Sequence, residues 1–494
     1  MKKITLLIFL PLLVLILVAS IPYWTGGQIE KALRAQSDLF QLQWQQQAGY
    51  SYQLSHYQRG YLSSVVETRF TFEPIITGLL ASTDSTAITP FSLTFRHQVS
   101  HAPWIDGRLS FTDMSEIETT LLPEGELQST SKFYFNQQAA FRMISRLEWS
   151  GGLRSDGRVL PYRGRDHTGQ YDVKWGGFRF SFEGDWIDAS GAGHFNAPRF
   201  ELSNASHGVM IGGLFGNFSR LMSPQNLPLG NGGVTLNTFQ LRGEGGAELP
   251  FLIVLRDMGI SYSLLQRGAL VDLSQQFEFR LLNVNGTPFN NGAFHYSFNN
   301  IDVVALQIIQ QQLSNFAQSE RADTALLPHE LLQMVQSLLP DLLAHSLVID
   351  ISKIELTTIS GMMSGRLKLG IEKGADIPAT FVLPNDLKRL LPLAKIEIEI
   401  KLPASIIEQQ AGKAVRAKII EQLMESEQTM TPEVLAEETS RAVDQMLGQL
   451  EIQNIIRREA GYVRARLRYE NSQLSLNGVP ADNFLRLLPA LKES

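Results

Sequence analysis

The 494-residue chain contains no cysteine. This absence excludes disulfide bonds, thiol nucleophiles, cysteine-ligated metal sites and the acylated cysteine of a lipoprotein. The chain also lacks an excess of positive charge, because 43 Lys and Arg residues stand against 49 Asp and Glu, a formal net charge of −6. Nucleic acid is therefore not an expected partner, since its phosphates attract basic surfaces.

Sequence motifs for catalysis and nucleotide binding are also missing. There is no Gly-x-Ser-x-Gly nucleophile elbow and no GxxxxGK[ST] phosphate loop, and no glycine-rich break lies between a strand and a helix as a GxGxxG loop requires. Residues 329–333 (HELLQ) have glutamine where a zinc protease motif needs its second histidine. We therefore expect a protein that is not an enzyme and that has no cofactor and no metal site.

An uncharged, mostly apolar run covers residues 4–24 and follows Lys2 and Lys3. A helix needs about 20 apolar residues to cross a bilayer, so the run predicts a single transmembrane helix. The two lysines favour a cytoplasmic amino end, with the remaining chain on the other side of the membrane.

A cleaved secretory signal is the competing interpretation of this run. The small residues Val18, Ala19 and Ser20 offer a cleavage site. A retained anchor is favoured because the run exceeds the usual apolar core of about 7–15 residues, and because Tyr23 and Trp24 suit a membrane interface. Under both interpretations the bulk of the chain is exported.

The segment after this run is expected to start with a break. Gly26-Gly27 should end the helix or supply a hinge. From Gln28 to Gln47, apolar residues such as Ile29, Leu33 and Phe40 recur close to helical spacing, which predicts a second, amphipathic helix.

A specific pattern follows at residues 57–64, where the sequence reads aromatic-x-Arg-Gly-aromatic-x-Ser-Ser. Together with the preceding apolar run and glycine pair, it resembles the YdgA family of bacterial envelope proteins. His101-Ala102-Pro103 is similar to that family's His-Gly-Pro, with alanine in place of glycine. The candidate site residues carried by this resemblance are Tyr57, Arg59, Gly60, Ser63, Ser64, His101 and Pro103.

The resemblance implies an inner-membrane anchor and a periplasmic domain, in a family whose function is not established, and it supplies no catalytic residues. Physical chemistry favours a structural role for the motif. Gly60 suits a bulge or a positive φ, and Arg59 suits a nearby carboxylate or carbonyl.

Two histidines share the apolar face of the predicted strand at residues 91–101. His97 and His101 are four residues apart, about 13 Å along a strand, so one metal ion cannot be held by both. We expect both to be partly buried and hydrogen-bonded.

Alternation of apolar and polar residues predicts antiparallel strands up to about Asn300, for example through Phe178, Phe180 and Phe182. The glycine-rich stretches 230–233 and 243–246 are expected to be turns or loops. Asn285-Gly286 and Asn477-Gly478 lie in matching Leu-x-aliphatic-Asn-Gly-x-Pro segments, which predicts tight turns.

Helical and strand-like patterns both occur in the last 200 residues. Helices are predicted from Ile301 and from Pro328, over residues 404–425, and after the cap Thr431-Pro432. Strands are predicted at residues 347–358, 367–372 and 396–402, followed by a last strand. Arg464, Arg466 and Arg468 share one face of that last strand. They could contact phosphate head groups, but we favour side chains that are solvated or paired with acidic residues on the neighbouring strand.

The predicted fold class is α+β: mostly antiparallel β-sheet with a single N-terminal transmembrane helix and several amphipathic helices in the C-terminal half. The expected domains are an anchor (1–25), a strand-rich periplasmic domain (26–325) and an α+β periplasmic domain (326–494). We expect a non-enzymatic, single-pass protein of the bacterial inner membrane that holds or guides an apolar ligand such as lipid between β-sheets. The alternative is a structural or self-associating protein of the envelope, a homo-oligomer joined through sheet edges.

Overall fold

The fold is described from a computed structural model. It describes residues 20–72, 91–244, 250–309, 340–371, 390–425 and 430–481, apart from gaps at residues 32, 36, 38–49, 106, 125, 137, 167, 187–189, 225–226 and 341.

The chain divides into two compact units. The first consists of Met1–Leu236, Arg242–Glu244 and Gln307–Leu327, and the second of Asn237–Leu241, Gly245–Leu306 and Pro328–Ser494. Strand β14 (Pro228–Gly243) contains residues of both units. The predicted domain boundary near residue 325 lies outside the described residues and stays a prediction.

The first unit contains an antiparallel sheet in which nine strands are paired in chain order. The strands are β1 (Tyr50–Arg59), β2 (Ser63–Phe72), β3 (Phe91–His101), β6 (Asp113–Leu122), β7 (Phe141–Glu148), β8 (Gly152–Val159), β11 (Phe178–Asp185), β12 (Gly191–Ser203) and β13 (Gly208–Met222). Apolar and polar residues alternate along many of them, as expected for strands with one covered face.

Smaller elements complete the first unit. Strands β9 (Tyr162–Arg165) and β10 (Asp172–Trp175) form a hairpin, and β10 also pairs with the carboxyl-terminal part of β12. Strands β4 (Trp104–Ile105) and β5 (Arg108–Leu109) form a separate two-stranded sheet. Helix α3 (Glu126–Phe135) follows β6.

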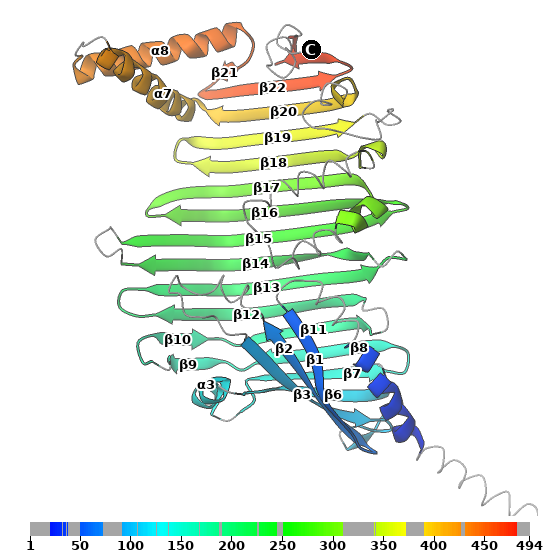
Figure 1. The fold of residues 1–494 in the computed structure, drawn as a ribbon. Coiled ribbons are helices and arrows are strands. Elements are labelled where there is room, and N and C mark those ends of the chain that lie inside the picture. The colour runs from blue at the N-terminus through cyan, green and yellow to red at the C-terminus, as the bar shows by residue number, and fades with distance from the viewer. Residues whose placement is uncertain are drawn as a thin grey trace, which may run out of the picture. The chain divides into compact units, whose positions relative to one another are not determined.

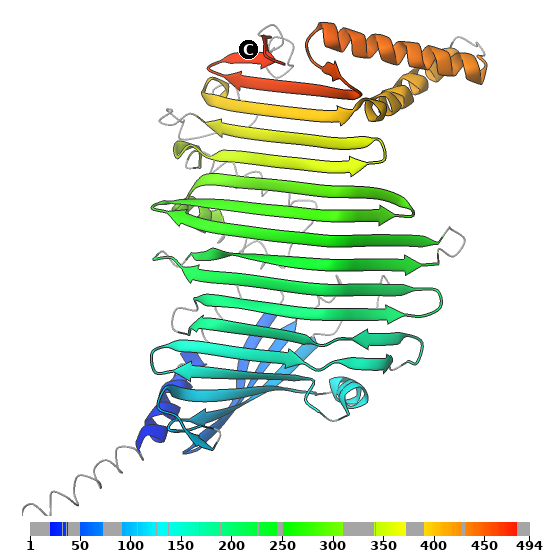
Figure 2. The ribbon, with the colours of Figure 1, turned by 180° about the vertical axis from the view of Figure 1, so that it is seen from behind.

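A helix formed by residues 20–31 packs on this sheet. Its Ile29 belongs to a buried cluster with Val66 of β2, Val99 of β3, Met114 of β6 and Leu147 of β7. Figure 1 shows β1, β2 and β3 running obliquely to β7 and β8, and Figure 2 shows the same crossing from behind. The sheet therefore bends around a core to which the helix contributes.

The prediction of a transmembrane helix is wrong for the part of the chain that the structure describes. No helix there is both long and apolar enough to cross a membrane. Residues 4–19 of the predicted span lie outside the described residues. Its last residues begin the helix of residues 20–31, where Thr25 and Ile29 are buried within the first unit.

The second unit also consists mainly of antiparallel strands, which Figure 1 shows one above the next. Seven strands pair in succession. They are β15 (Phe251–Arg267), β16 (Leu270–Val284), β17 (Thr287–Asp302), β18 (Val348–Thr358), β19 (Gly361–Ile371), β20 (Ala394–Pro403) and β22 (Tyr462–Glu470). Three short strands extend the sheet beyond β22. Strands β21 (Arg457–Glu459) and β23 (Gln473–Leu476) both pair with β22, and β24 (Val479–Pro480) pairs with β23. The prediction of mostly antiparallel sheet agrees with both units.

Two of the predicted helices are confirmed in the second unit. Helix α7 (Ala404–Glu425) follows β20, and helix α8 (Pro432–Ile452) starts after Thr431, whose side chain accepts a hydrogen bond from the backbone N–H of Val434. Leu447 of α8 is buried with Val463 of β22. A 3₁₀ turn, η1 (Leu391–Leu393), precedes β20.

The helix predicted from Ile301 begins two residues later than expected. Strand β17 continues to Asp302, and residues 303–309 are helical. The Asp302 carboxylate accepts hydrogen bonds from the N–H groups of Val304 and Ala305 at 2.9 and 3.0 Å, which makes it the cap of this helix. The helix predicted from Pro328 lies outside the described residues.

The turn predictions had mixed outcomes. Asn285-Gly286 and Asn477-Gly478 have positive φ at both residues, as a type I′ hairpin turn requires, and are confirmed. The turn predicted at residues 230–233 is wrong, because they lie inside β14. A Cβ at Gly230 would lie 2.0 Å from the carbonyl oxygen of Ser219, so glycine permits the close approach of β13.

Candidate functional site

The motif residues meet at one side of the helix of residues 20–31. Tyr57 and Arg59 lie at the end of β1, Ser63 and Ser64 begin β2, and His101 ends β3. Antiparallel pairing places Ser64 opposite both Arg59 and Val99. Pro103 follows His101 closely, after a cis peptide bond with Ala102, and is fully buried.

The Arg59 side chain lies on the helix. Its guanidinium donates a hydrogen bond to the carbonyl oxygen of Tyr23, lies 4.4 Å from the centre of the Tyr23 ring, and is 3.8 Å from a Glu30 carboxylate oxygen. A Cβ at Gly27 would be 3.2 Å from the guanidinium. The expectation that Arg59 pairs with a carbonyl or carboxylate is confirmed.

A buried hydrogen-bond network lies beside Arg59. His101 Nδ1 is 3.3 Å from the Tyr61 carbonyl oxygen and donates to it, so Nε2 of the neutral ring accepts from the Ser64 hydroxyl at 3.1 Å. Tyr57 Oη lies 3.4 Å from Ser64 Oγ and 3.5 Å from the carbonyl oxygen of Gly26. The network thus links three strands' ends to the helix backbone.

Burial is the main reason that the pKa of His101 is lowered. The Tyr61 carbonyl opposes this effect, and the positive charge of Arg59 adds to the lowering. His101 is therefore neutral at pH 7, so its Nε2 can accept the hydrogen bond from the Ser64 hydroxyl.

The Ser64–His101 pair has the residue types of a nucleophile and its general base. Their exposed fractions are 1% and 0%, so no substrate can reach Ser64 Oγ in this conformation. A Cβ at Gly26 would lie 2.6 Å from the His101 ring, which shows how closely the helix covers the pair. The contacts of the motif residues therefore hold the helix against the sheet.

Gly60 has a different role from the expected positive φ. Its N–H donates to the carbonyl oxygen of Ser63 at 2.8 Å, and a Cβ at this position would lie only 2.5 Å from that oxygen. Its φ is not among the positive values of the chain. Close approach within the turn is what requires glycine here.

His97 confirms the expectation of hydrogen-bonded histidines. Its two ring nitrogens lie 2.8 Å from the hydroxyl oxygens of Thr68 and Thr119. Burial lowers its pKa from 6.5 to about 4. Within the described residues, no group of three or more His, Asp or Glu side chains is placed to hold a metal ion.

The sequence did not predict the partners of the motif on the helix. Gly26 and Gly27 were expected to break or hinge the chain, but both are helical. Their lack of side chains makes room for His101 and Arg59. The glycine pair is therefore the sequence feature that could have predicted the contact with His101 and Arg59, because glycine occurs where chain segments pack closely as well as where the chain is flexible.

The second unit presents a row of apolar residues across its sheet, called here the apolar row. Each residue is directly opposite the next on the neighbouring strand. The row consists of Ile260, Phe277, Phe294, Ile354, Gly365, Ile400 and Ala465.

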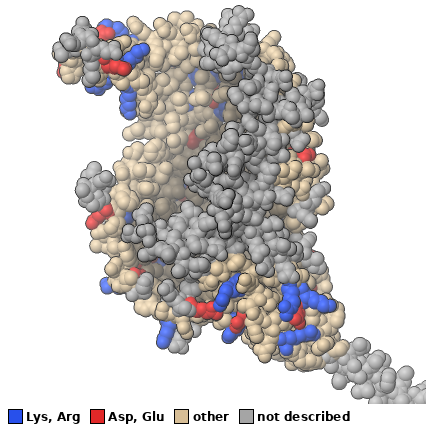
Figure 3. All heavy atoms as spheres, in the orientation of Figure 1, with Lys and Arg blue, Asp and Glu red and all other residues tan. Residues whose placement is uncertain are grey.

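Part of the apolar row is open to solvent. Phe294, Ile354 and Ile400 are 37%, 42% and 44% exposed, and Gly365 between the last two has no side chain. Where the strands of the second unit are visible in Figure 3, few charged side chains are seen. Scattered exposed apolar residues are normal in proteins, but an aligned set on adjoining strands indicates a contact surface.

The opposite face of the same sheet is polar and carries ion pairs. Glu278, next to Phe277 along β16, accepts a hydrogen bond from His295 Nε2 at 2.8 Å. Lys353 lies 3.3 Å from Glu355 and 3.9 Å from Glu278. The sheet is therefore amphipathic across its strands.

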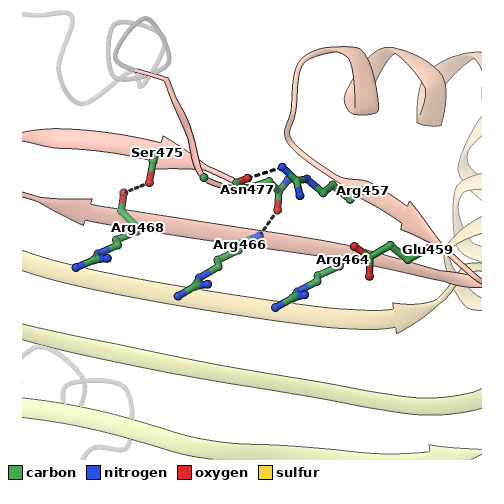
Figure 4. A pocket seen from close by; sticks show the side chains of 8 residues that line it. Arg457, Glu459, Arg464, Arg466, Arg468, Ser475 and Asn477 are labelled. Atoms are coloured by element: carbon green, nitrogen blue, oxygen red, sulfur yellow. Dashed lines mark hydrogen bonds between the residues drawn. The ribbon is translucent and has the colours of Figure 1, made fainter.

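The three arginines of β22 lie next to one another on this polar side, as Figure 4 shows. Arg464 pairs with Glu399, Arg466 with Glu397 at 2.8 Å, and Arg468 with Glu470 at 2.6 Å. The expectation of acidic partners on the neighbouring strand is confirmed for Arg464 and Arg466, whereas the partner of Arg468 lies on β22 itself.

Glu399 shows how strongly these arginines act on the carboxylates. Burial raises its pKa, but the hydrogen bond from Arg464 and the charges of Arg464, Arg366 and Arg466 outweigh burial, so its pKa is lowered.

Comparison with known proteins identifies the family of this chain. No curated protein matches it, and no solved structure matches it. The family model of DUF945, described as a bacterial protein of unknown function, matches residues 1–482. The chain therefore belongs to the DUF945 family of bacterial proteins.

Proposed function

We propose that this chain is a non-enzymatic protein of the bacterial envelope, and that its second unit holds or guides the acyl chain of a lipid along the apolar row. The resemblance of the residue 57–64 motif to the YdgA family supports the envelope location. The apolar row is the observation that supports binding of an acyl chain.

The shape of the row favours a linear apolar ligand. Its residues cross seven strands, and six strand spacings of about 4.8 Å give a length of roughly 29 Å. An acyl chain extends through about half of a hydrocarbon layer of about 30 Å, so it fits within this length. Covering Phe294, Ile354 and Ile400 removes apolar surface from water, which stabilises the complex by about 25 cal/mol for each Å².

Labelling with a photoreactive fatty acid tests this proposal. The full-length protein is irradiated with the fatty acid, and labelled peptides are located by mass spectrometry. We expect labels on β17, β18 and β20, and strong loss of labelling in Ile400→Asp, because a carboxylate in the row disfavours apolar contact. Ile359→Asp is the matched control, since Ile359 is 90% exposed in the turn between β18 and β19, away from the row.

Two outcomes would contradict the proposal. Labels spread over both faces of the sheet would show nonspecific adsorption. Equal loss of labelling in Ile359→Asp and Ile400→Asp would show that the row has no special role. Self-association through a sheet edge stays the alternative prediction, and among the described strands β1 pairs with β2 alone.

A further inference from the structure

A pocket lies at the end of the second unit's sheet, where two short strands share the edge of β22. Strand β21 pairs with β22 from Tyr462 to Arg464, and β23 pairs with it from Leu467 to Glu470. A cavity of about 390 Å³ opens there. Its lining, called here the arginine pocket, consists of Arg457, Glu459, Arg464, Arg466, Arg468, Ser475, Asn477 and Gly478.

The arginine side chains of β22 are parallel in this pocket. Figure 4 shows Arg464, Arg466 and Arg468 extending in the same direction across β20. Their side chains are 38%, 42% and 60% exposed, so a ligand can reach them. Asn477 shapes the rim: its carbonyl oxygen accepts from Arg457 at 2.7 Å, and its side-chain oxygen accepts from the N–H of Arg466 at 2.8 Å.

Positive charge exceeds negative charge around the pocket. By strand register and alternation, the pocket's face of β19, β20, β21 and β22 carries eight cations, Arg366, Lys368, Lys395, Lys401, Arg457, Arg464, Arg466 and Arg468. The same face of these strands carries four carboxylates, Glu397, Glu399, Glu459 and Glu470, and Asp350 of β18 lies directly opposite Lys368. The eight cations therefore outnumber the five carboxylates by three.

Arg464 has the least favourable position among these cations. It is directly opposite Arg457 on β21 and directly opposite Lys401 on β20. Like charges in direct cross-strand pairs repel and are destabilising. Glu399 is the acidic partner of Arg464, and it also lies 2.8 Å from Arg366. A bound anion would relieve this repulsion.

We propose that the arginine pocket binds the phosphate group of an anionic ligand. Guanidinium groups donate two parallel hydrogen bonds to phosphate oxygens, and three parallel arginines at alternate strand positions offer several such forks. The pocket lies on the polar face, opposite the apolar row, because Arg464 and Arg466 flank Ala465 along β22. The proposal therefore goes beyond the acyl-chain function and does not depend on it.

Two binding measurements on the full-length protein test the proposal. Calorimetric titration with inorganic phosphate at low salt measures recognition of the group itself. Co-sedimentation with phosphatidylcholine vesicles, with and without phosphatidic acid, distinguishes a lipid head group from a soluble phosphate ester. The first variant is Arg464→Gln. The second variant, Ser475→Asp, keeps every arginine and adds a carboxylate to the pocket lining.

Arg441→Gln is the matched control. It removes the same charge from the exposed surface of α8, where Arg441 pairs with Glu437 and Glu438. We expect wild-type protein and Arg441→Gln to bind phosphate equally, and Arg464→Gln and Ser475→Asp to bind about tenfold more weakly or worse, since a hydrogen bond between charged groups is lost or opposed. Binding should also weaken with added salt.

The vesicle measurement assigns the source of the phosphate. Binding that requires phosphatidic acid and is competed by phosphate indicates a lipid head group, whereas phosphate binding without vesicle binding indicates a soluble phosphate ester. Absence of phosphate binding by the wild type, or an equal loss in Arg441→Gln, overturns the proposal. Failure of fatty-acid labelling at the apolar row leaves this result unaffected, so the two proposals fail separately.

Discussion

Glycine residues in these strands make room for phenylalanine rings on the neighbouring strand. Phe180 is directly opposite Gly157, Phe195 is opposite Gly216, and Phe279 is opposite Gly292. In each case a Cβ on the glycine would lie 2.0 to 2.2 Å from the ring. The rings cover glycine backbone that would otherwise weaken a strand interior.

Replacing such a glycine should destabilise the sheet. We expect Gly292→Val to lower the free energy of unfolding by about 1–3 kcal/mol, the usual cost of overpacking, because the Phe279 ring must move. The midpoint of urea-induced unfolding measures the change. Gly259→Val is the control, since a Cβ at Gly259 of β15 meets nothing within 4 Å. Equal destabilisation by both variants would contradict this explanation.

Protonation of His97 should oppose folding at low pH. Its pKa falls from 6.5 to about 4 on burial, so between these values the unfolded chain binds more protons and stability rises with pH. The stabilisation is present above pH 6.5 and is lost as the pH falls toward 4, by about 3 kcal/mol at 1.36 kcal/mol per pKa unit.

A His97→Gln variant isolates this contribution. Between pH 7 and pH 4 it should lose about 3 kcal/mol less unfolding free energy than the wild type, measured by urea unfolding at each pH. The same pH dependence in both proteins would show that His97 does not contribute.

At the scale of elements, the motif and the helix of residues 20–31 form one structure. The sequence predicted which strand-end residues matter and that Arg59 needs a carbonyl or carboxylate. It did not predict the helix as their common partner, because strand periodicity says which face a residue occupies but not what packs on that face. For the same reason the sequence does not show that Gly26 and Gly27 lie inside this helix.

Removing the Arg59 side chain should loosen this helix. Arg59→Ala loses the hydrogen bond to the Tyr23 carbonyl and the contact with the Tyr23 ring. We expect backbone amides of residues 24–31 to exchange with solvent deuterium about tenfold faster or more, because a hydrogen bond from a charged group is lost.

Arg69→Ala provides the control for that experiment. It removes an arginine of β2 that pairs with exposed Glu124, away from the helix, so exchange in residues 24–31 should stay as in the wild type. Unchanged exchange in Arg59→Ala would mean that Arg59 does not hold the helix.

Elements with strong local signals were the most predictable. Alternation identified β11, β16, β17 and β20, and the Thr431-Pro432 cap identified the start of α8. The turn prediction at Gly230 failed because the sequence does not distinguish a glycine inside a strand from a glycine in a turn. Only the fold shows that the carbonyl of Ser219 lies too close to Gly230 for a side chain.

At the scale of the whole molecule, strand partners could not be predicted. Alternation in β10 gives no indication that this strand pairs with the carboxyl-terminal part of β12 while β11 pairs with the amino-terminal part. Nor does it tell a covered apolar face from an open one, since both have the same pattern. The exposure of Phe294, Ile354 and Ile400 on aligned positions became visible only through the strand register.

Lipid analysis of the full-length protein, purified without detergent from bacterial cells, tests the central claim most directly. We expect co-purifying lipid in near-stoichiometric amount in the wild type and in Ile359→Asp. We expect a large reduction in a folded Phe294→Asp or Ile400→Asp variant, because these substitutions place a charge in the apolar row. A well-folded wild-type preparation that contains no lipid would contradict the account.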